Sequence, residues 1–307
     1  MADFSAKDVA ELRKQTGCGM MDCKNALKDA NGDFEAAVKI LREKGMAAVA
    51  KKASRIAAEG IVDVMTIGST TAIVEVNSET DFVAKNAIFQ AFVKDVLKTI
   101  IANKPADVDA LMACKFEGEG EGTVSDALAE KTGTIGEKLS IRRFAVIEGA
   151  VSTYIHGLGA TGVVVSFDTD VADKAEFAEC AKNVALQTAA MPVQYLDKDS
   201  VPAAVLAEEK AILVKQMQQD PKMANKPQQV LEKIVEGKLG KFYENNCLLH
   251  QLYVKDDSMT VAKYVESVAK ALGGSIKVTG YVRYDKGEGL EKREEDFAAE
   301  IQKMVQG

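Results

Sequence analysis

The spacing of apolar residues in the first part of the chain predicts helices. Val9 and Leu12 share one face of a first helix, and a second helical pattern covers residues 19–32. A third covers residues 33–45, and the basic, alanine-rich segment 47–60 predicts a linker or a short helix. Helices packed from so short a stretch form a small domain with a marginal core.

The pattern then changes to β-branched runs. The runs 61–67 and 71–76 flank Gly68-Ser69, which predicts a β-hairpin. A single helical pattern follows the hairpin and extends to Pro105. Its apolar positions are Ile88, Ala91, Phe92, Val96, Leu97 and Ile101.

The hairpin pattern returns after 89 residues. Residues 62–81 align with residues 151–170 at six identical positions of 20, and both copies run into a helical pattern. The repeat predicts two related subdomains, each a hairpin followed by a helix. The identical pairs are Val62/Val151, Gly68/Gly157, Val74/Val163, Val76/Val165, Thr80/Thr169 and Asp81/Asp170.

Two long helical patterns follow the second copy. They cover residues 203–219 and 228–244 and are separated by a turn that prolines bracket at 220–227. The apolar positions predict an antiparallel helical hairpin, a short coiled coil. The residues expected to face each other are Leu206, Ile212 and Leu213 on the first helix and Leu231, Ile234 and Leu239 on the second.

The remaining segments complete an α+β fold. Residues 114–126 predict an acidic, flexible loop, residues 260–274 a helix, and residues 275–284 a strand that completes the second sheet. A charged helix is predicted at the C-terminus. The predicted domains are the helical unit with its linker at 1–55, a first core subdomain at 56–145, a second at 146–284 with the helical hairpin inserted at about 198–245, and a C-terminal helical module at 285–307.

Composition narrows the classes of function. The chain has 307 residues, 47% of them hydrophobic and 28% charged, with a net charge of −7. This balance argues against a protein that binds nucleic acid through broad phosphate neutralisation. The N-terminus has no signal or transit pattern, and no run reaches the ~20 apolar residues that span a bilayer. Five scattered cysteines suit reduced thiols, so we expect a cytoplasmic protein without a membrane partner.

Motifs for catalysis or cofactor binding are weak. Cys18 and Cys23 lack the spacing of a zinc or redox pair, and the glycines of 118–122 lack the lysine of a phosphate loop. The GxGxxG-like stretch at 157–162 precedes a strand instead of a helix. We therefore expect no cofactor, no metal site and no catalytic residue, and a binding protein instead of an enzyme.

Asp81-Phe82 opens the helical pattern after the first hairpin, where the second copy has Asp170-Val171. A helix start favours a capping residue and an acidic residue, but it does not need phenylalanine. Two interpretations stay open. Phe82 either pins the first helical turn by a hydrophobic contact, or forms a tip presented to a partner. His156, at the second hairpin turn, is either a surface residue or local hydrogen-bond donor, or a contact of the same kind.

Five stretches, in this order along the chain, resemble the bacterial elongation factor Ts family. They are LRKQTGCGMMDCKNAL, TDFVAKN, IGEKLSIRR, YIHG and GEGLEKREEDFAAE. They span nearly the whole chain, and TDFV in that position is highly specific. The N-terminal unit is also similar to ubiquitin-associated domains, which have three helices.

The resemblance implies a guanine-nucleotide exchange factor that acts in translation elongation. Family members bind elongation factor Tu in its GDP form, expel GDP and leave a nucleotide-free complex that GTP resolves. The TDFV segment, here Thr80, Asp81, Phe82 and Val83, enters beside the nucleotide site and disturbs the magnesium ion. Residues of the N-terminal unit, here Arg13, Met20 and Met21, touch the nucleotide-binding domain. The histidine of the YIHG turn, here His156, contacts a more distant domain.

Several alternatives stay open. The N-terminal unit also suits a scaffold or chaperone-type binding module, and Cys18 or Cys23 suits a thiol enzyme. Met20 and Met21 also suit core positions, with one facing inward and the other outward, because adjacent helical positions diverge by ~100°. The sequence also leaves open a homodimer or a heterotetramer with the GTPase.

Overall fold

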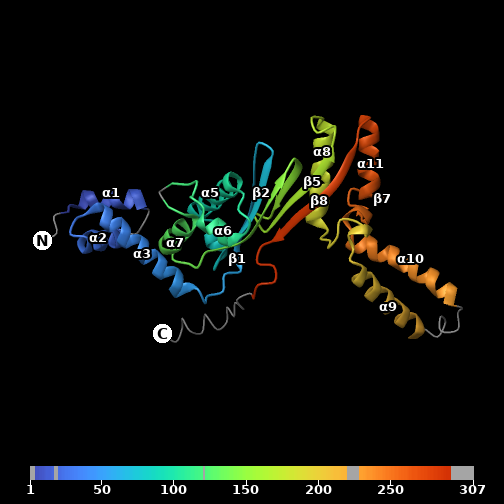
Figure 1. The fold of residues 1–307 in the computed structure, drawn as a ribbon, viewed down its shortest axis with the longest axis horizontal. Coiled ribbons are helices and arrows are strands. Elements are labelled where there is room, and N and C mark those ends of the chain that lie inside the picture. Colours follow the sequence, from blue (N-terminus) through green and yellow to red (C-terminus); the bar gives the residue numbers. More distant parts are fainter. Residues whose placement is uncertain (1–3, 17–19, 120–121, 220–227, 292–307) are drawn as a thin grey trace, which may run out of the picture. The chain divides into compact units, whose positions relative to one another are not determined.

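The computed structural model describes residues 4–16, 20–119, 122–219 and 228–291. The chain forms two compact units. The first contains the chain up to residue 148, residues 155–162 and the chain from 284 onward, and the second contains residues 149–154 and 163–283. Helices and small sheets occur in both (Figure 1), which confirms the predicted α+β class. The predicted domain boundaries stay predictions.

The three predicted N-terminal helices are present. They are α1 (Ala6–Thr16), α2 (Met20–Asp29) and α3 (Phe34–Lys52). The side chain of Asp33 caps α3 by accepting a hydrogen bond from the N–H of Ala36 at 2.9 Å. The helices enclose a small core of Val9, Leu12, Cys23, Ala26, Leu27, Ala37 and Leu41.

Helix α3 continues past Gly45, so the predicted helix end there is wrong, and residues 47–52 are helical. Gly45 lies where α3 packs against α7 (Val124–Ile135). A Cβ atom at Gly45 would lie 3.0 Å from the carbonyl oxygen of Ala129. The glycine therefore permits close approach of two helices, and the helix tolerates it because that packing offsets its poor helix propensity.

The first sheet contains the predicted hairpin. Strand β1 (Glu59–Ile67) pairs antiparallel with β2 (Thr70–Ser78), which also pairs antiparallel with β3 (Ser140–Glu148). The sheet order is β1-β2-β3, so β2 is central. All nine residues of β2 are buried, as expected for a strand that is paired on both sides and covered by helices.

Helices α5 (Ala87–Asn103), α6 (Val108–Ala113) and α7 gather beside this sheet (Figure 1) and share its core. The single helix predicted up to Pro105 is wrong, because a one-turn helix, α4 (Asp81–Ala84), precedes α5. The side chain of Asn86 caps α5 by accepting from the N–H of Ile88 at 2.8 Å. Ile88 and Ala91 are exposed, and Phe89 and Val93 take the buried face.

Residues at both ends of the segment 114–126, predicted as a flexible loop, have defined contacts. The N–H of Val124 donates to the carbonyl of Cys114 at 3.0 Å and closes its base. Phe116 is buried, with its ring centroid 5.8 Å from that of Phe92. Helix α7 begins inside the segment at Val124, residues 120–121 lie outside the described residues, and the flexibility of the loop stays a prediction.

The second sheet has the order β4-β5-β8. Its strands are β4 (Ala150–His156), β5 (Thr161–Thr169) and β8 (Ile276–Asp285), so the strand predicted near residue 276 does complete the second sheet. Val163 and Val165 are buried on the central strand β5, as their repeat partners Val74 and Val76 are on β2. The repeated sequence pattern thus marks the central strand of each sheet.

Helices α8 (Ala175–Ala190) and α11 (Val261–Leu272) enclose the core of the second unit. Short elements connect them to the rest of that unit. These are η1 (Lys198–Ser200), η2 (Leu248–His250), β6 (Leu252–Tyr253) and β7 (Asp256–Thr260).

The predicted helical hairpin consists of α9 (Ala203–Gln219) and α10 (Gln228–Asn246). The two helices run side by side (Figure 1) around the buried residues Leu213, Met217, Val235 and Leu239. Ile212 is exposed, so its predicted facing position is wrong, since Leu213 already fills that turn of the seam. The predicted turn at 220–227 and the predicted C-terminal helix lie outside the described residues.

Candidate functional site

The TDFV segment presents an aromatic ring to solvent. The Phe82 side chain, on α4, is 79% exposed, whereas Val83 beside it is buried. At the matching position of the second repeat copy, Val171 is only 7% exposed. The segments that follow the two equivalent hairpins therefore differ, because the first exposes its apolar side chain and the second buries it. The predicted hydrophobic contact that pins the helix start is wrong for Phe82, because its ring lies outside the core.

Glu137 holds the start of this segment. One carboxylate oxygen, Oε2, accepts from the N–H of Glu79 at 3.1 Å and from the N–H of Thr80 at 2.9 Å. The other, Oε1, accepts from the hydroxyl of Thr80 at 2.6 Å. Hydrogen bonds to a carboxylate are stronger than bonds between neutral groups, so this residue fixes the backbone that leads into α4.

The hydrogen bonds of Glu137 to Glu79 and Thr80 form a clamp on the start of the TDFV segment, and neighbouring residues add further bonds to it. Glu79 accepts from the N–H of Lys138 at 2.6 Å and from the guanidinium of Arg55 at 3.1 Å. The Lys138 ammonium donates to the carbonyls of Ala53 and Arg55 at 2.7 and 2.9 Å. The IGEKL part of the motif at 135–143 therefore joins the tip to the chain that leaves α3.

Asp81 forms a local ion pair beside the exposed ring. Its Oδ2 lies 2.6 Å from Nζ of Lys85, which also lies 6.0 Å from the centroid of the Phe82 ring. The hydrogen bond from Lys85 holds the pKa of Asp81 below its ordinary value. The tip thus carries a carboxylate, an ammonium and an aromatic ring on a single helical turn.

Replacement of Glu137 by alanine is expected to loosen the tip. The N–H groups of Glu79 and Thr80 would lose their acceptor, and each such loss costs about 1–3 kcal/mol where the group stays buried. Hydrogen–deuterium exchange of these two amides should become at least about fivefold faster. Glu130→Ala, which removes a partly exposed carboxylate on α7 that pairs with Lys131, is the control and should leave both rates unchanged. Equal rates in the Glu137 variant and the wild type would contradict the clamp.

A second network of hydrogen bonds and ion pairs surrounds a fully buried carboxylate on β2, the strand that precedes the TDFV segment. Glu75, on β2, is 0% exposed and accepts from Nη1 of Arg142 at 3.0 Å and from Nε of Arg143 at 2.6 Å. It also accepts from the N–H of Gly287 at 2.8 Å and from Nδ2 of Asn77 at 3.1 Å. Burial raises the pKa of Glu75, but these hydrogen bonds outweigh burial and hold it below its ordinary value.

The same network gives a structural role to Gly287 and Glu288, the first residues of the GEGLEKREEDFAAE stretch. Gly287 has a φ of +68°, and a Cβ atom there would lie 2.2 Å from the carbonyl oxygen of Ala58. Glu288 pairs with Arg143 at 3.0 Å. The turn that contains these two residues therefore closes over Glu75, and only glycine fits at its first position.

His156 lies at the end of β4 and is exposed, as predicted for a turn residue. The turn belongs to the first unit, which also contains the TDFV tip. Its backbone is tied to that unit, since the N–H of Val62 donates to the carbonyl of Gly159 at 2.8 Å.

The N-terminal candidates are all on the surface. Arg13 is exposed on α1, and Met20 and Met21, at the start of α2, are 46% and 62% exposed. The prediction that one methionine faces inward is wrong. The buried face of α2 begins at Cys23 and continues with Ala26 and Leu27, so both methionines lie off this face. Their roles as contact residues stay predictions.

Of the four thiols in the described residues, those of Cys23, Cys180 and Cys247 are buried and poorly suited to nucleophilic chemistry, whereas Cys114 is partly exposed. Cys23 is buried, and burial raises the pKa of Cys180 and of Cys247 to about 11. Cys18 lies outside the described residues. Where the structure describes the chain, no group of three or more His, Cys, Asp or Glu side chains is arranged to hold a metal ion.

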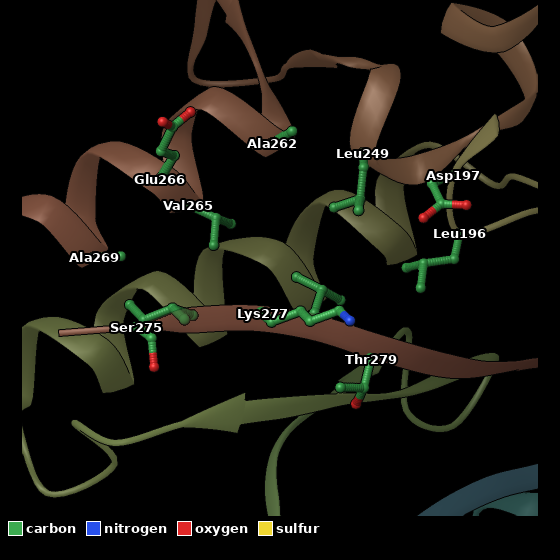
Figure 2. A pocket seen from close by; sticks show the side chains of 12 residues that line it. Leu196, Asp197, Leu249, Ala262, Val265, Glu266, Ala269, Ser275, Lys277 and Thr279 are labelled. Carbon is green, nitrogen blue, oxygen red and sulfur yellow. The ribbon is translucent and has the colours of Figure 1, made fainter. Parts of the chain in front are cut away.

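The second unit has a pocket of about 580 Å³ between α11 and β8 (Figure 2). Its lining is mostly apolar, with Asp197, Glu266 and Lys277 as its charged residues. Asp197 is engaged in capping η1, where its side chain accepts from the N–H groups of Asp199 and Ser200. The pocket therefore lacks a set of converging polar groups of the kind that binds a small substrate.

None of the described helices has the length and apolar character to cross a membrane.

Comparison with known proteins gives a consistent match. A family model described as elongation factor TS matches residues 79–288. A protein named elongation factor Ts from Syntrophotalea carbinolica is 46% identical over 305 residues, which cover 98% of this chain and 99% of the relative. Another of that name, from Clostridioides difficile, is 46% identical over 310 residues, covering 99% of this chain and all of the relative.

Proposed function

The chain belongs to the elongation factor Ts family of translation elongation factors, and from this premise we propose that it exchanges guanine nucleotide on elongation factor Tu. It binds the GDP form of that GTPase, promotes GDP release and leaves a complex that GTP resolves. The observation that carries the proposal is the exposed Phe82 ring on a one-turn helix that Glu137 holds in place.

Exchange requires coupling between two binding events. The exchange factor weakens nucleotide binding, and the nucleotide must weaken binding of the exchange factor by the same factor. A magnesium ion in the GTPase bridges phosphate and protein oxygens, so its displacement removes a large positive charge from the phosphates. Phe82 wedges apart the elements that hold this ion, while the Asp81 carboxylate repels or redirects polar groups of the site.

Rigidity of the tip matters to this role. A flexible aromatic side chain would fold onto the GTPase surface without displacing anything, whereas a fixed one transmits its binding energy to the elements it separates. The hydrogen bonds of Glu137 to Glu79 and Thr80 supply that rigidity. Glu137 is therefore a positioning residue for Phe82, and Val83 anchors the same turn from the buried side.

The other contacts distribute over the same unit. Arg13, Met20 and Met21 touch the nucleotide-binding domain of the GTPase, and His156 touches a more distant domain. Exposure of all four side chains is compatible with these roles. The protein acts in the cytoplasm, binds both the GDP-bound and nucleotide-free GTPase, and has no hydrolase or transferase activity of its own.

Release of a fluorescent GDP analogue from purified elongation factor Tu tests the proposal. The fluorescence decay is measured after mixing with excess unlabelled GDP, with and without this chain. We expect release to accelerate in proportion to the amount of chain added until the GTPase is saturated. Unchanged release, with both proteins folded, would remove the exchange function and favour the scaffold role of the N-terminal unit.

A further inference from the structure

Leu158 combines two features that are unfavourable in the free protein. Its side chain is 85% exposed, and its backbone is left-handed, with a φ of +55°. A bulky side chain rarely adopts this backbone because its Cβ crowds the neighbouring carbonyl. Glycine or asparagine would form the same turn more readily. Folding of the turn therefore does not require leucine at this position.

The turn around Leu158 is closed by its own hydrogen bonds. The N–H groups of Gly159 and Ala160 both donate to the carbonyl of His156, at 3.2 and 3.0 Å. The N–H of Ala160 also lies 3.2 Å from the carbonyl of Gly157, so the peptide units on both sides of Leu158 are held. The left-handed backbone is thus maintained by its neighbours and not by the leucine itself.

The turn is also fixed to the rest of the first unit. The carbonyl of Gly159 accepts from the N–H of Val62 at 2.8 Å, and the carbonyl of Ala160 accepts from the N–H of Lys286 at 2.9 Å. A Cβ atom at Gly159 would lie 2.8 Å from Cβ of Ile61. With the backbone packed directly on β1, the turn has no space to tilt the Leu158 side chain inward.

We propose that Leu158 is an apolar anchor for elongation factor Tu, with its side chain seated in a pocket of apolar residues on the GTPase. The inference rests on the proposed function. Leu158 lies two residues from His156 on the same turn, and this turn belongs to the same compact unit as Phe82. A contact at His156 therefore brings Leu158 to the GTPase surface as well.

The geometry suits an anchor. A leucine held outward on a fixed backbone loses little conformational freedom when it binds, so most of the gain from burying it contributes to affinity. Its role is in holding the complex, since the ring proposed to disturb the magnesium site lies on α4. Loss of Leu158 should therefore weaken binding and leave the maximal rate of GDP release at saturation nearly unchanged.

Leu158→Asn tests the proposal because stability and binding should respond differently. Asparagine adopts the left-handed backbone more readily than leucine, so the thermal unfolding midpoint should stay equal or rise. The Kd for GDP-bound elongation factor Tu, measured by titration calorimetry, should rise about tenfold or more. Leu158→Met keeps an apolar side chain and should stay within about threefold of the wild-type Kd.

Val254→Asn is the matched control. Val254 is also an exposed apolar residue at a hairpin turn, between β6 and β7 in the second unit. Its replacement should leave the Kd unchanged. A wild-type Kd for Leu158→Asn would overturn the anchor. If that variant unfolds, Leu158→Gly, which relieves the same backbone, replaces it in both measurements. Wild-type chain that fails to bind the GTPase would overturn the proposed function itself, so the two failures are distinguishable.

Discussion

Phe82→Ala is expected to remove most of the acceleration of GDP release, by about 30- to 100-fold at saturation. The substitution removes the ring that enters beside the magnesium site and leaves the bonds of Glu137 to the backbone in place. The complex should still form, because the other contacts remain. The measurement is stopped-flow fluorescence of the GDP analogue over a range of chain concentrations, which separates affinity from maximal rate.

The Phe82→Ala variant should fold as the wild type does. A side chain that is 79% exposed contributes little to the core, so the free energy of unfolding should change by less than about 0.5 kcal/mol. Ile88→Ala is the control, since Ile88 is also an exposed apolar residue at the start of a nearby helix. It should release GDP at the wild-type rate. A wild-type maximal rate for Phe82→Ala, with the complex formed, would show that the ring is not the wedge.

Local sequence signals predicted most of the elements. Gly68-Ser69 between β-branched runs specified the first hairpin, and the repeat located the central strand of each sheet through its paired valines. Helix α11 also follows its local signals, with the Thr260 side chain capping one end and left-handed Gly273 ending the other. For the hairpin and for α11 the determining contacts lie within a few residues, so a single sequence contains them.

The errors occurred where distant packing decided the outcome. Gly45 looks like a helix end, but it allows α3 to approach Ala129, which is far away in the sequence. The break at Asn86 was missed because Ile88 and Ala91 fit a continuous apolar face that the fold does not use. Local pattern gives a period, while tertiary packing decides which face is buried.

The candidate site shows the same difference between residues marked by local sequence signals and residues placed by long-range contacts. Comparison of the two copies singles out the TDFV segment and the His156 turn from the sequence. It does not single out Glu137, although this residue stands in a stretch that resembles the family. It lies 57 positions from Thr80 in the sequence, and only the fold brings its carboxylate to the backbone there. A charged residue within a specific motif, placed directly after a helix end, was the available signal.

Glu75→Gln is expected to lower the free energy of unfolding of the protein strongly. The buried carboxylate accepts from Arg142 and Arg143, and a neutral amide removes this buried counter-charge, so that the ion pair left to Arg143 among the described residues is the exposed one with Glu288. Because each arginine side chain is about a quarter exposed and can turn toward water, we expect a loss of about 2–3 kcal/mol. Urea unfolding at pH 7 measures it.

Glu288→Gln is the control, since it changes the same chemical group opposite the same residue, Arg143. The Glu288 side chain is 55% exposed, so its pair with Arg143 contributes under about 1 kcal/mol. Similar losses of unfolding free energy in the two variants would contradict the view that burial makes the ion pairs of Glu75 more stabilising.

The pH dependence supplies an independent test of Glu75. Its pKa in the folded protein lies below the ordinary value of 4.5, so its contribution to stability is fully present above that pH. The contribution falls as the pH drops through the folded pKa, because the carboxylate must then bind a proton in both states. Glutamine has no such proton. The difference in unfolding free energy between wild type and Glu75→Gln should therefore shrink as the pH falls below 4.5. A constant difference across this range would mean that the loss comes from packing and not from the buried charge.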